Sequence, residues 1–408
     1  MEFHQTEIDN GLTIVAEVNP AAASMAAGFF VRTGSRDETE DIAGVSHFLE
    51  HMVFKGTDRR SALQVNIDFD EMGADYNAFT SEENTVFYGA VLPEFQTRLL
   101  DLLGDLLRPS LRQADFDVEK NVILDEIARY MDQPRFRVYE SLMTEHFAPH
   151  PLGHSILGTP KSIGALKRDQ MLEYFQRRYS PGNITVVGTG NIDFAAFTDK
   201  VAQMCGRWQA HDVSRKTSPA SPAANLKVVQ DTKVLREHIG LMSAAPSRQD
   251  EHRYAAELLS AIVGDATGSR LYYALVEPAI ADEAGMSFSP MDGEGAFFTF
   301  VAADAPRATE ALGIVRRELD KFADEGPTEQ ELQAAKNKIA SHATLRGELP
   351  MGRLAAVGFD WTYRGLYTPL PEEIEKLFAV GRQDVLELAR KCRLTQATVY
   401  ALGPLERL

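Results

Sequence analysis

Hydrophobic positions in the first half of the chain follow two different periods. Residues 7–18 and 25–33 are rich in apolar and β-branched residues, which predicts two strands. Residues 61–72 and 93–107 repeat apolar side chains every three or four positions, as amphipathic helices do. Residues 74–91 alternate apolar and polar positions, which predicts a β-hairpin. The first half therefore mixes sheet and helix.

A similar order of elements recurs after a segment without periodicity. Residues 209–224 are rich in Ser, Ala and Pro, with Lys and Asp among the rest, which is typical of a linker. Beyond them, patterns of strand, helix, strand and helix follow in turn. We therefore expect an α+β fold of two related domains, each a mainly antiparallel sheet packed against helices. The first would span residues 1–208 and the second 225–408.

The most distinctive stretch is His-Phe-Leu-Glu-His, residues 47–51. The surrounding pattern predicts a helix that Gly56 is placed to end. On that helix His47 and His51 are four positions apart with Glu50 between them, so all three project from one face. Two imidazoles at this spacing can bind one Zn²⁺, and the carboxylate can take a proton from water. Histidine pairs at this spacing also occur by chance on amphipathic helices.

A third ligand is expected, because catalytic zinc usually has three protein ligands and one open position. A helix predicted over residues 115–132 carries Glu119 and Glu126 seven positions apart, on one face. Val122 and Ile123 are expected on the same side, which would then pack inward. Two inward carboxylates need a charge partner such as a divalent cation. The alternative is that both glutamates lie on a solvated flank.

These two segments together resemble the M16 (pitrilysin and insulinase type) metallopeptidases, in a half-length form. The signature of that family is His-x-x-Glu-His, followed some 75 residues later by a helix with Glu-x6-Glu. Here Glu126 follows His51 by 75 positions. The resemblance implies that His47, His51 and Glu126 bind one Zn²⁺ per chain. It also implies that Glu50 is the general base and that Glu119 orients a ligand.

Other segments extend the resemblance over nearly the whole chain. Residues 73–81 are similar to the family's edge strand, so Asn77, Ala78 and Phe79 are expected to bind peptide as an added strand. The family further implies that the two domains form half of a clamshell, and that two such halves enclose short unfolded peptides in a chamber. Similar matches occur at residues 9–15, 34–38, 150–153, 179–183 and 326–332.

One family feature is missing. Members commonly stabilise the oxyanion with an Arg and a Tyr seven residues apart, after a Ser-Arg-Leu segment. That segment is present at residues 269–271, but the aligned positions hold Val276 and Glu283. The oxyanion would then be stabilised by a partner subunit, or by the arginine and tyrosines of residues 270–273. The third alternative is that the chain is weakly active. We expect a homodimer, or a heterodimer with an M16-type partner that has the pair.

Composition narrows the remaining possibilities. The chain has 408 residues, of which 44% are hydrophobic and 25% are charged. This composition is typical of soluble globular proteins. A net charge of −17 argues against binding to nucleic acid. This charge would attract cationic peptides, or it would serve solubility alone. Two cysteines, Cys205 and Cys392, predict no disulfide framework and fit the cytoplasm. No leader or membrane-spanning run is expected.

We therefore expect a zinc-dependent endopeptidase of the M16 type that cleaves short unfolded peptides. The alternative is a non-catalytic or partner-dependent scaffold subunit of an M16-type complex. Such scaffold relatives typically lose the zinc residues, which this chain retains.

Overall fold

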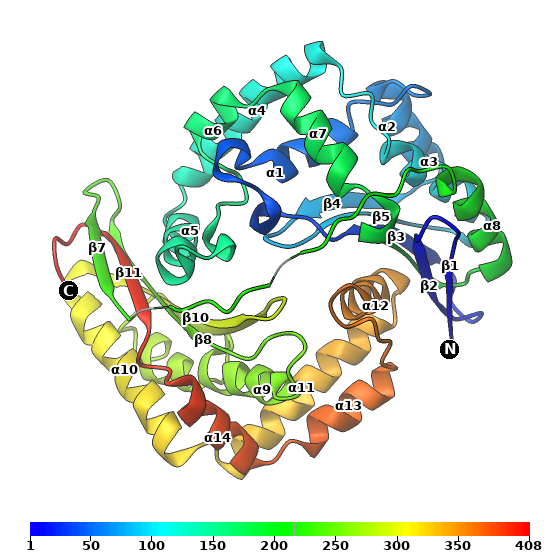
Figure 1. Cartoon of the computed structure of the whole chain (residues 1–408). Helices are drawn as coiled ribbons and strands as arrows, with labels where there is room; N and C mark the ends of the chain where they lie inside the picture. Colours follow the sequence, from blue (N-terminus) through cyan, green and yellow to red (C-terminus); the bar gives the residue numbers. More distant parts are fainter. Residues whose placement is uncertain (216, 223) are drawn as a thin grey trace. The chain divides into compact units, whose positions relative to one another are not determined.

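The protein, described here from a computed structural model, forms two compact units that each contain one sheet (Figure 1). The structure describes residues 1–215, 217–222 and 224–408. Unit 1 comprises Met1–Ala128, His154–Lys216 and Thr344–Thr368. Unit 2 comprises Arg129–Gly153, Thr217–Ala343 and Pro369–Leu408. Each unit combines its sheet with several helices, which confirms the expected α+β class.

Unit 1 is built on a six-stranded sheet in the order β1-β2-β6-β3-β5-β4. Its strands are β1 (Glu2–Glu7), β2 (Thr13–Val18), β3 (Met25–Val31), β4 (Asp75–Thr80), β5 (Thr85–Val91) and β6 (Ile184–Gly190). Neighbouring strands pair antiparallel, except that β2 and β6 are parallel. Strand β4 forms one edge of this sheet, next to β5 (Figure 1).

Helices cover both faces of this sheet. Those of unit 1 are α1 (Val45–Val53), α2 (Ala62–Glu71), α3 (Gln96–Leu106), α4 (Gln113–Met131), α6 (Pro160–Ala165), α7 (Arg168–Arg178), α8 (Phe194–Cys205) and α12 (Pro350–Arg364). Helices α3 and α8 pack together on one face. On the other face, Leu354 and Val357 of α12 form a core cluster with Phe30 of β3. Successive strand residues point to opposite faces, so a continuous apolar strand such as β3 fits between two helical layers.

Unit 2 repeats this plan with a five-stranded sheet in the order β7-β11-β8-β10-β9. Its strands are β7 (Leu226–Gln230), β8 (Arg236–Ala244), β9 (Glu283–Pro290), β10 (Gly295–Asp304) and β11 (Thr398–Gly403). Its helices are α5 (Pro134–Phe147), α9 (Arg253–Gly264), the π-helix η6 (Tyr272–Val276), α10 (Ala308–Glu325), α11 (Glu329–Gly347), α13 (Leu370–Ala379) and α14 (Arg382–Cys392). The order matches β2-β6-β3-β5-β4 of unit 1, including its single parallel pair. The two sheets thus have the same topology.

The two units are not the two continuous halves predicted at 1–208 and 225–408. Residues 129–153 belong to unit 2 and residues 344–368 to unit 1. The reason is hydrophobic packing, because α5 buries Val138 and Leu142 on the unit 2 sheet. Helix α12 likewise covers the unit 1 sheet. Another of the points at which the chain passes from unit 1 to unit 2 falls within the predicted linker, residues 209–224.

The close fit of α12 onto β3 gives a first test of the fold. A Cβ added to Gly358 would lie 2.1 Å from the ring of Phe30, which is itself buried. We expect Gly358→Ala to lower the free energy of unfolding by about 1–3 kcal/mol, as overpacked cores do. This loss should outweigh the helix preference of alanine over glycine. Denaturant unfolding measures the effect.

The matched control is Gly313→Ala on α10. A Cβ there would meet only the end of the Arg317 side chain, at 3.5 Å. Helix preference should therefore dominate, and this variant should be neutral or slightly stabilised. Equal destabilisation of the two variants would contradict the tight α12 packing.

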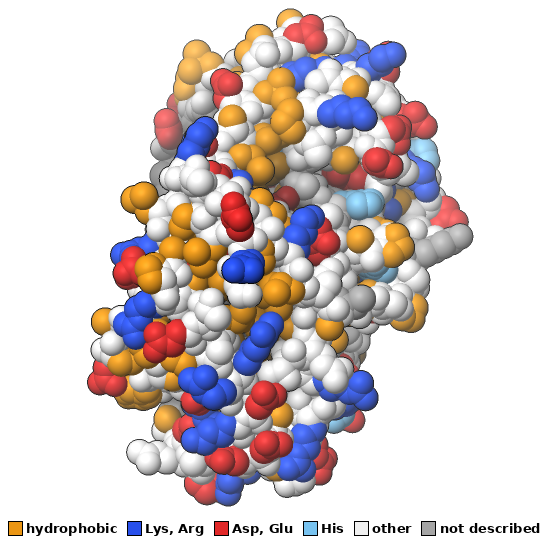
Figure 2. Space-filling model, turned by 90° about the vertical axis from the view of Figure 1, so that its left-hand side faces the viewer, with side chains coloured by type: hydrophobic (Ala, Val, Ile, Leu, Met, Phe, Trp, Pro, Cys, Tyr) orange, Lys and Arg blue, Asp and Glu red, His pale blue; other side chains and the backbone are white. Residues whose placement is uncertain are grey.

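The surface carries charges of both signs. On the face shown in Figure 2, Lys and Arg side chains are interspersed with Asp and Glu, with hydrophobic patches between them. The acidic excess of the chain therefore produces no uniform negative field on that face. None of the helices in the described part of the chain is long and apolar enough to span a bilayer.

Candidate metal centre

Helix α1 carries the two histidines and is anchored at its start. It follows Gly44, whose φ of +91° glycine adopts without strain. The Glu38 carboxylate accepts hydrogen bonds from the backbone N–H groups of Gly44, at 2.6 Å, and Ser46, at 2.7 Å. Burial raises the pKa of Glu38 to about 8, although these two bonds act in the opposite direction. Glu38 thus holds the first turn of α1. This role was not predicted from the sequence.

Helix α4 presents the two glutamates. Its buried side chains are Phe116, Glu119, Ile123 and Ile127. Val122 is 45% exposed, so its expected inward position is wrong. The reason is helical geometry, since neighbouring residues point about 100° apart and Ile123 lies at the centre of the buried face. Glu126 lies at the margin of that face, with 15% of its side chain exposed.

The structure brings His47, His51 and Glu126 together. Glu126 Oε2 lies 3.4 Å from His51 Nε2 and 3.8 Å from His47 Nε2. One ligand atom from each of the three residues lies within 4.8 Å of the others. Two ligand atoms at zinc distances and a tetrahedral angle lie about 3.4 Å apart. The donor set of two imidazoles and one carboxylate therefore fits a zinc ion. Within the described residues this is the only such cluster of metal-ligating side chains.

The charge state of the histidines also fits a cation. Burial, followed by the neighbouring His51, lowers the pKa of His47 to about 3, so His47 is neutral at pH 7. A neutral imidazole is the form that binds metal. For His51, burial acts to lower the pKa, but Glu119, Glu126 and Glu50 together raise it. Several carboxylates thus surround the histidines, and this environment favours a positive charge.

Glu119 contacts one of the candidate ligands, His51. Its side chain is 3% exposed, and its Oε1 lies 2.9 Å from His51 Nδ1. Its Oε2 lies 2.6 Å from Lys55 Nζ. Burial would raise the pKa of Glu119, but His51 and Lys55 lower it. An ionised Glu119 that accepts a bond from Nδ1–H leaves Nε2 of His51 free to face Glu126.

Glu119→Gln should weaken zinc binding about 10- to 100-fold, as losses of such outer hydrogen bonds do. The variant loses the charge that polarises His51 but keeps nearly the same shape. Competition with a chromogenic chelator measures the affinity. Asp125→Asn, an exposed charge loss on the same helix, is the control and should retain the original affinity. Equal affinities for Glu119→Gln and this control would contradict the orienting role.

Glu50 lies on α1, the helix of the two histidines, and its carboxylate points to β4. Its Oε2 accepts a 2.7 Å hydrogen bond from Oγ1 of Thr80, the last residue of β4. Burial raises the pKa of Glu50 and Glu126 adds to this, whereas Thr80 and His51 act in the opposite direction. Thr80 was not predicted from the sequence. The available signal was its spacing of two from Ala78, which places both side chains on one face of the strand.

The predicted peptide-binding residues lie on the edge strand. Asn77 and Phe79 are exposed and Ala78 is half-buried. Because side chains alternate along a strand, Phe79 points to the face opposite Thr80. Its ring centroid lies 6.1 Å from that of Phe359 on α12. The backbone of β4 is thus next to Glu50, while the Phe79 ring lies on the other side of the sheet.

The positions aligned with the missing Arg/Tyr pair lie in unit 2. Val276 ends η6 and Glu283 begins β9, where Glu283 forms an ion pair with Arg135 of α5. Arg270, a suggested substitute, donates to Glu331 at 2.7 and 2.9 Å. Its guanidinium therefore has a structural role within unit 2.

This fold and this cluster of side chains define a peptidase family. Residues 13–160 match the profile of insulinase (peptidase family M16), and residues 165–339 match that of the peptidase M16 inactive domain. An uncharacterized zinc protease of Bacillus subtilis, YmxG, is 30% identical over 97% of both chains. The chain therefore belongs to peptidase family M16.

Solved structures agree on the fold. A peptidase M16 inactive domain from Pseudomonas fluorescens superimposes with a TM-score of 0.93 and 18% identity, over 100% of this chain and 99% of the other. A protease from Helicobacter pylori gives a TM-score of 0.93 and 20% identity, over 99% of both chains. At these identities the two structures support the fold alone.

Proposed function

We propose that this protein is a zinc-dependent endopeptidase that cleaves short unfolded peptides. The observation that carries the proposal is the convergence of His47, His51 and Glu126 around one point. The Glu50 carboxylate lies on the face of α1 that carries the two histidines. His47, His51 and Glu126 would hold one zinc ion per chain. That the B. subtilis relative is named a zinc protease supports the same metal.

In this proposal a zinc ion would supply Lewis acidity, which lowers the pKa of water toward about 7 and polarises the scissile carbonyl. Glu50 takes a proton from the attacking water as the water oxygen bonds to the carbonyl carbon. Glu50 then gives this proton to the leaving amine nitrogen as the C–N bond breaks. Thr80 holds one Glu50 oxygen, which leaves the other oxygen to handle the proton.

The substrate would bind as an extra strand on β4. An edge strand offers backbone N–H and C=O groups to an extended peptide, and Asn77, Ala78 and Phe79 lie along it. Folded proteins rarely offer such a segment, so unfolded peptides are the expected class. The exposed Phe79 would contact substrate side chains that point to the α12 face of the sheet.

The second candidate function is that of a partner-dependent subunit. The observation that favours it is Glu283, which carries a carboxylate where the family usually has a helper tyrosine, and which is paired with Arg135. An M16-type partner would then supply the Arg/Tyr pair in a heterodimer. The alternative assembly is a homodimer, and the two cysteines fit a cytoplasmic setting for either.

The test is digestion of a mixed peptide library by the purified chain, with products mapped by mass spectrometry. The proposal predicts internal cleavage of extended peptides, no cleavage of folded proteins, and loss of activity with a chelator. Size-exclusion chromatography of the same sample reports its oligomeric state. Activity that persists in the chelator would contradict a zinc mechanism. Activity that appears only after addition of an M16-type partner would favour the second function.

A further inference from the structure

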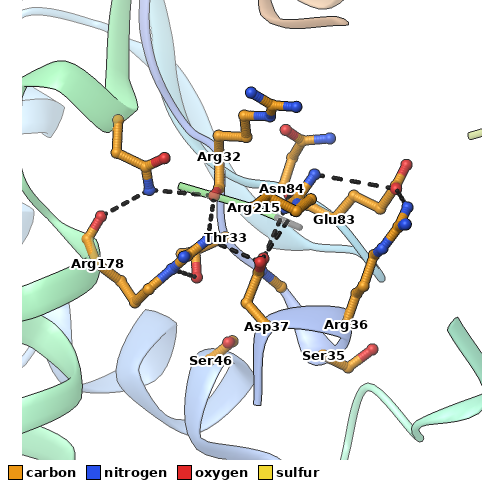
Figure 3. A network of polar contacts seen from close by, with 12 residues as sticks. Arg32, Thr33, Ser35, Arg36, Asp37, Ser46, Glu83, Asn84, Arg178 and Arg215 are labelled. Atoms are coloured by element: carbon orange, nitrogen blue, oxygen red, sulfur yellow. Dashed lines mark hydrogen bonds and ion pairs between the residues drawn. The ribbon is translucent and has the colours of Figure 1, made fainter. Parts of the chain in front are cut away.

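The side chain of Arg215 is buried, although this residue lies in the segment that its composition marks as a linker. Only 3% of its side chain is exposed. Its Nε and Nη2 donate to the two carboxylate oxygens of Asp37 at 3.0 and 2.6 Å, and Nη2 also donates to the backbone carbonyl of Glu83 at 2.6 Å (Figure 3). Asp37 ends the 3-10 turn η1 (Ser35–Asp37). Such a forked contact fixes the guanidinium in one geometry.

Further groups hold the turn that joins β4 to β5, residues 81–84. The Glu83 carboxylate accepts hydrogen bonds from Arg36 at 2.6 Å and from the hydroxyl of Tyr363, on α12, at 2.8 Å. The backbone N–H of Arg36 donates to the carbonyl of Glu82 at 2.8 Å. Segments far apart in the sequence therefore meet at this turn within unit 1.

Arg215 is not needed to neutralise the buried carboxylates. Asp37 also pairs with Arg178, at 2.8 Å, and Glu83 also pairs with Arg36. Without Arg215, each carboxylate retains one arginine. The contribution specific to Arg215 is therefore geometric: its guanidinium joins Asp37 of η1 to the Glu83 carbonyl, in addition to the two hydrogen bonds by which Arg36 of η1 holds the same turn (Figure 3).

The turn leads directly to the general base. Thr80 lies three positions before Glu83 and donates the 2.7 Å hydrogen bond to Glu50. If the turn shifts and carries Thr80 about 1 Å away from Glu50, this bond lengthens beyond hydrogen-bond range. The same displacement would shift the free edge of β4. The position of Glu83 therefore affects both the base and the edge strand.

We propose that Arg215 is a positioning residue, which holds the β4–β5 turn so that Thr80 orients the Glu50 carboxylate. The functional part of this inference rests on the proposed peptidase activity. Its structural part, that Arg215 fixes Thr80 against Glu50, is independent of activity. The two parts call for separate measurements.

The kinetic measurement is a double-mutant cycle of Arg215→Met and Thr80→Val, with rates per zinc-loaded, folded molecule. Each single variant should lose about 10- to 100-fold in kcat, as misplacement of a catalytic group does. If Arg215 acts through Thr80, the double variant should lose no more than Thr80→Val alone. Losses that multiply, or an unchanged kcat in Arg215→Met, would overturn the proposal.

Arg353→Met is the matched control. Arg353 forms an equally forked and buried pair with Glu17, at 2.8 and 2.6 Å, on β2 rather than at the β4–β5 turn. It should lose stability but keep its kcat per folded molecule. An equal loss of kcat in both arginine variants would indicate a general structural effect and contradict the positioning role.

The structural measurement is a crystal structure of Arg215→Met, with hydrogen exchange over residues 75–84. We expect a displaced turn, a lost hydrogen bond between Thr80 and Glu50, and faster exchange than in Arg353→Met. An intact bond with unchanged exchange would overturn the inference. If the wild-type chain cleaves no peptide, the proposed function fails, and these structural results still decide the role of Arg215.

Discussion

Replacing Glu50 by glutamine is expected to reduce the rate of peptide cleavage by about 10²- to 10⁴-fold, which is the typical contribution of a positioned general base. Glutamine keeps the size of the side chain and can still accept from Thr80, but it cannot take a proton from water. Zinc content should remain at one ion per chain, because Glu50 is not among the three clustered ligands. Steady-state cleavage of a fluorogenic peptide, with metal analysis of the same sample, measures both quantities.

Glu40→Gln is the control for this experiment, since Glu40 is exposed and precedes α1. It should cleave at the wild-type rate. Retention of wild-type activity by the Glu50 variant would exclude Glu50 as the base. Loss of zinc together with activity would instead indicate that Glu50 is needed to build the metal site.

Replacing His51 by alanine is expected to remove both the zinc and the activity. The variant loses one ligand nitrogen and also leaves Glu119 without its imidazole partner. Wild-type protein should lose thermal stability when zinc is chelated, because a ligand at 1,000 times its Kd contributes about 4 kcal/mol. The variant should show no such response. Metal analysis after dialysis and melting curves with and without chelator measure these effects.

His342→Ala, on an exposed part of α11, provides the comparison. It should bind one zinc ion and respond to the chelator as the wild type does. A His51 variant that retains one tightly bound zinc ion would place the metal elsewhere in the chain.

The local pattern predicted most of the candidate centre. His47, Glu50 and His51 needed only helical spacing. A second amphipathic helix offered Glu119 and Glu126 as candidates, and the choice of Glu126 as the third ligand came from the family resemblance. The structure brings the ligand atoms of His47, His51 and Glu126 together. Their chemical roles remain proposals. Lys55, Thr80 and Arg215 could not be predicted in the same way, because their contacts depend on how separate segments pack.

The sequence predicted the fold class, but not which segments of the chain belong to which unit. Helix α12 was not predicted, and Gly352 and Gly358 within it weaken its helical signal. Both glycines are required by close packing, since a Cβ at either would lie about 2 Å from a neighbouring atom. The exchange of α5 and α12 between the units also has no local signature. An apolar helix face indicates burial, but not which sheet will cover it.

The central claim is that one zinc ion, held by His47, His51 and Glu126, makes this chain a peptidase. The most direct test is to titrate zinc into metal-free protein and to measure the rate of peptide cleavage at each step. The account predicts a rate that rises from zero and stops rising at one zinc ion per chain. Cleavage by the metal-free protein, or one bound zinc ion without any cleavage, would contradict it.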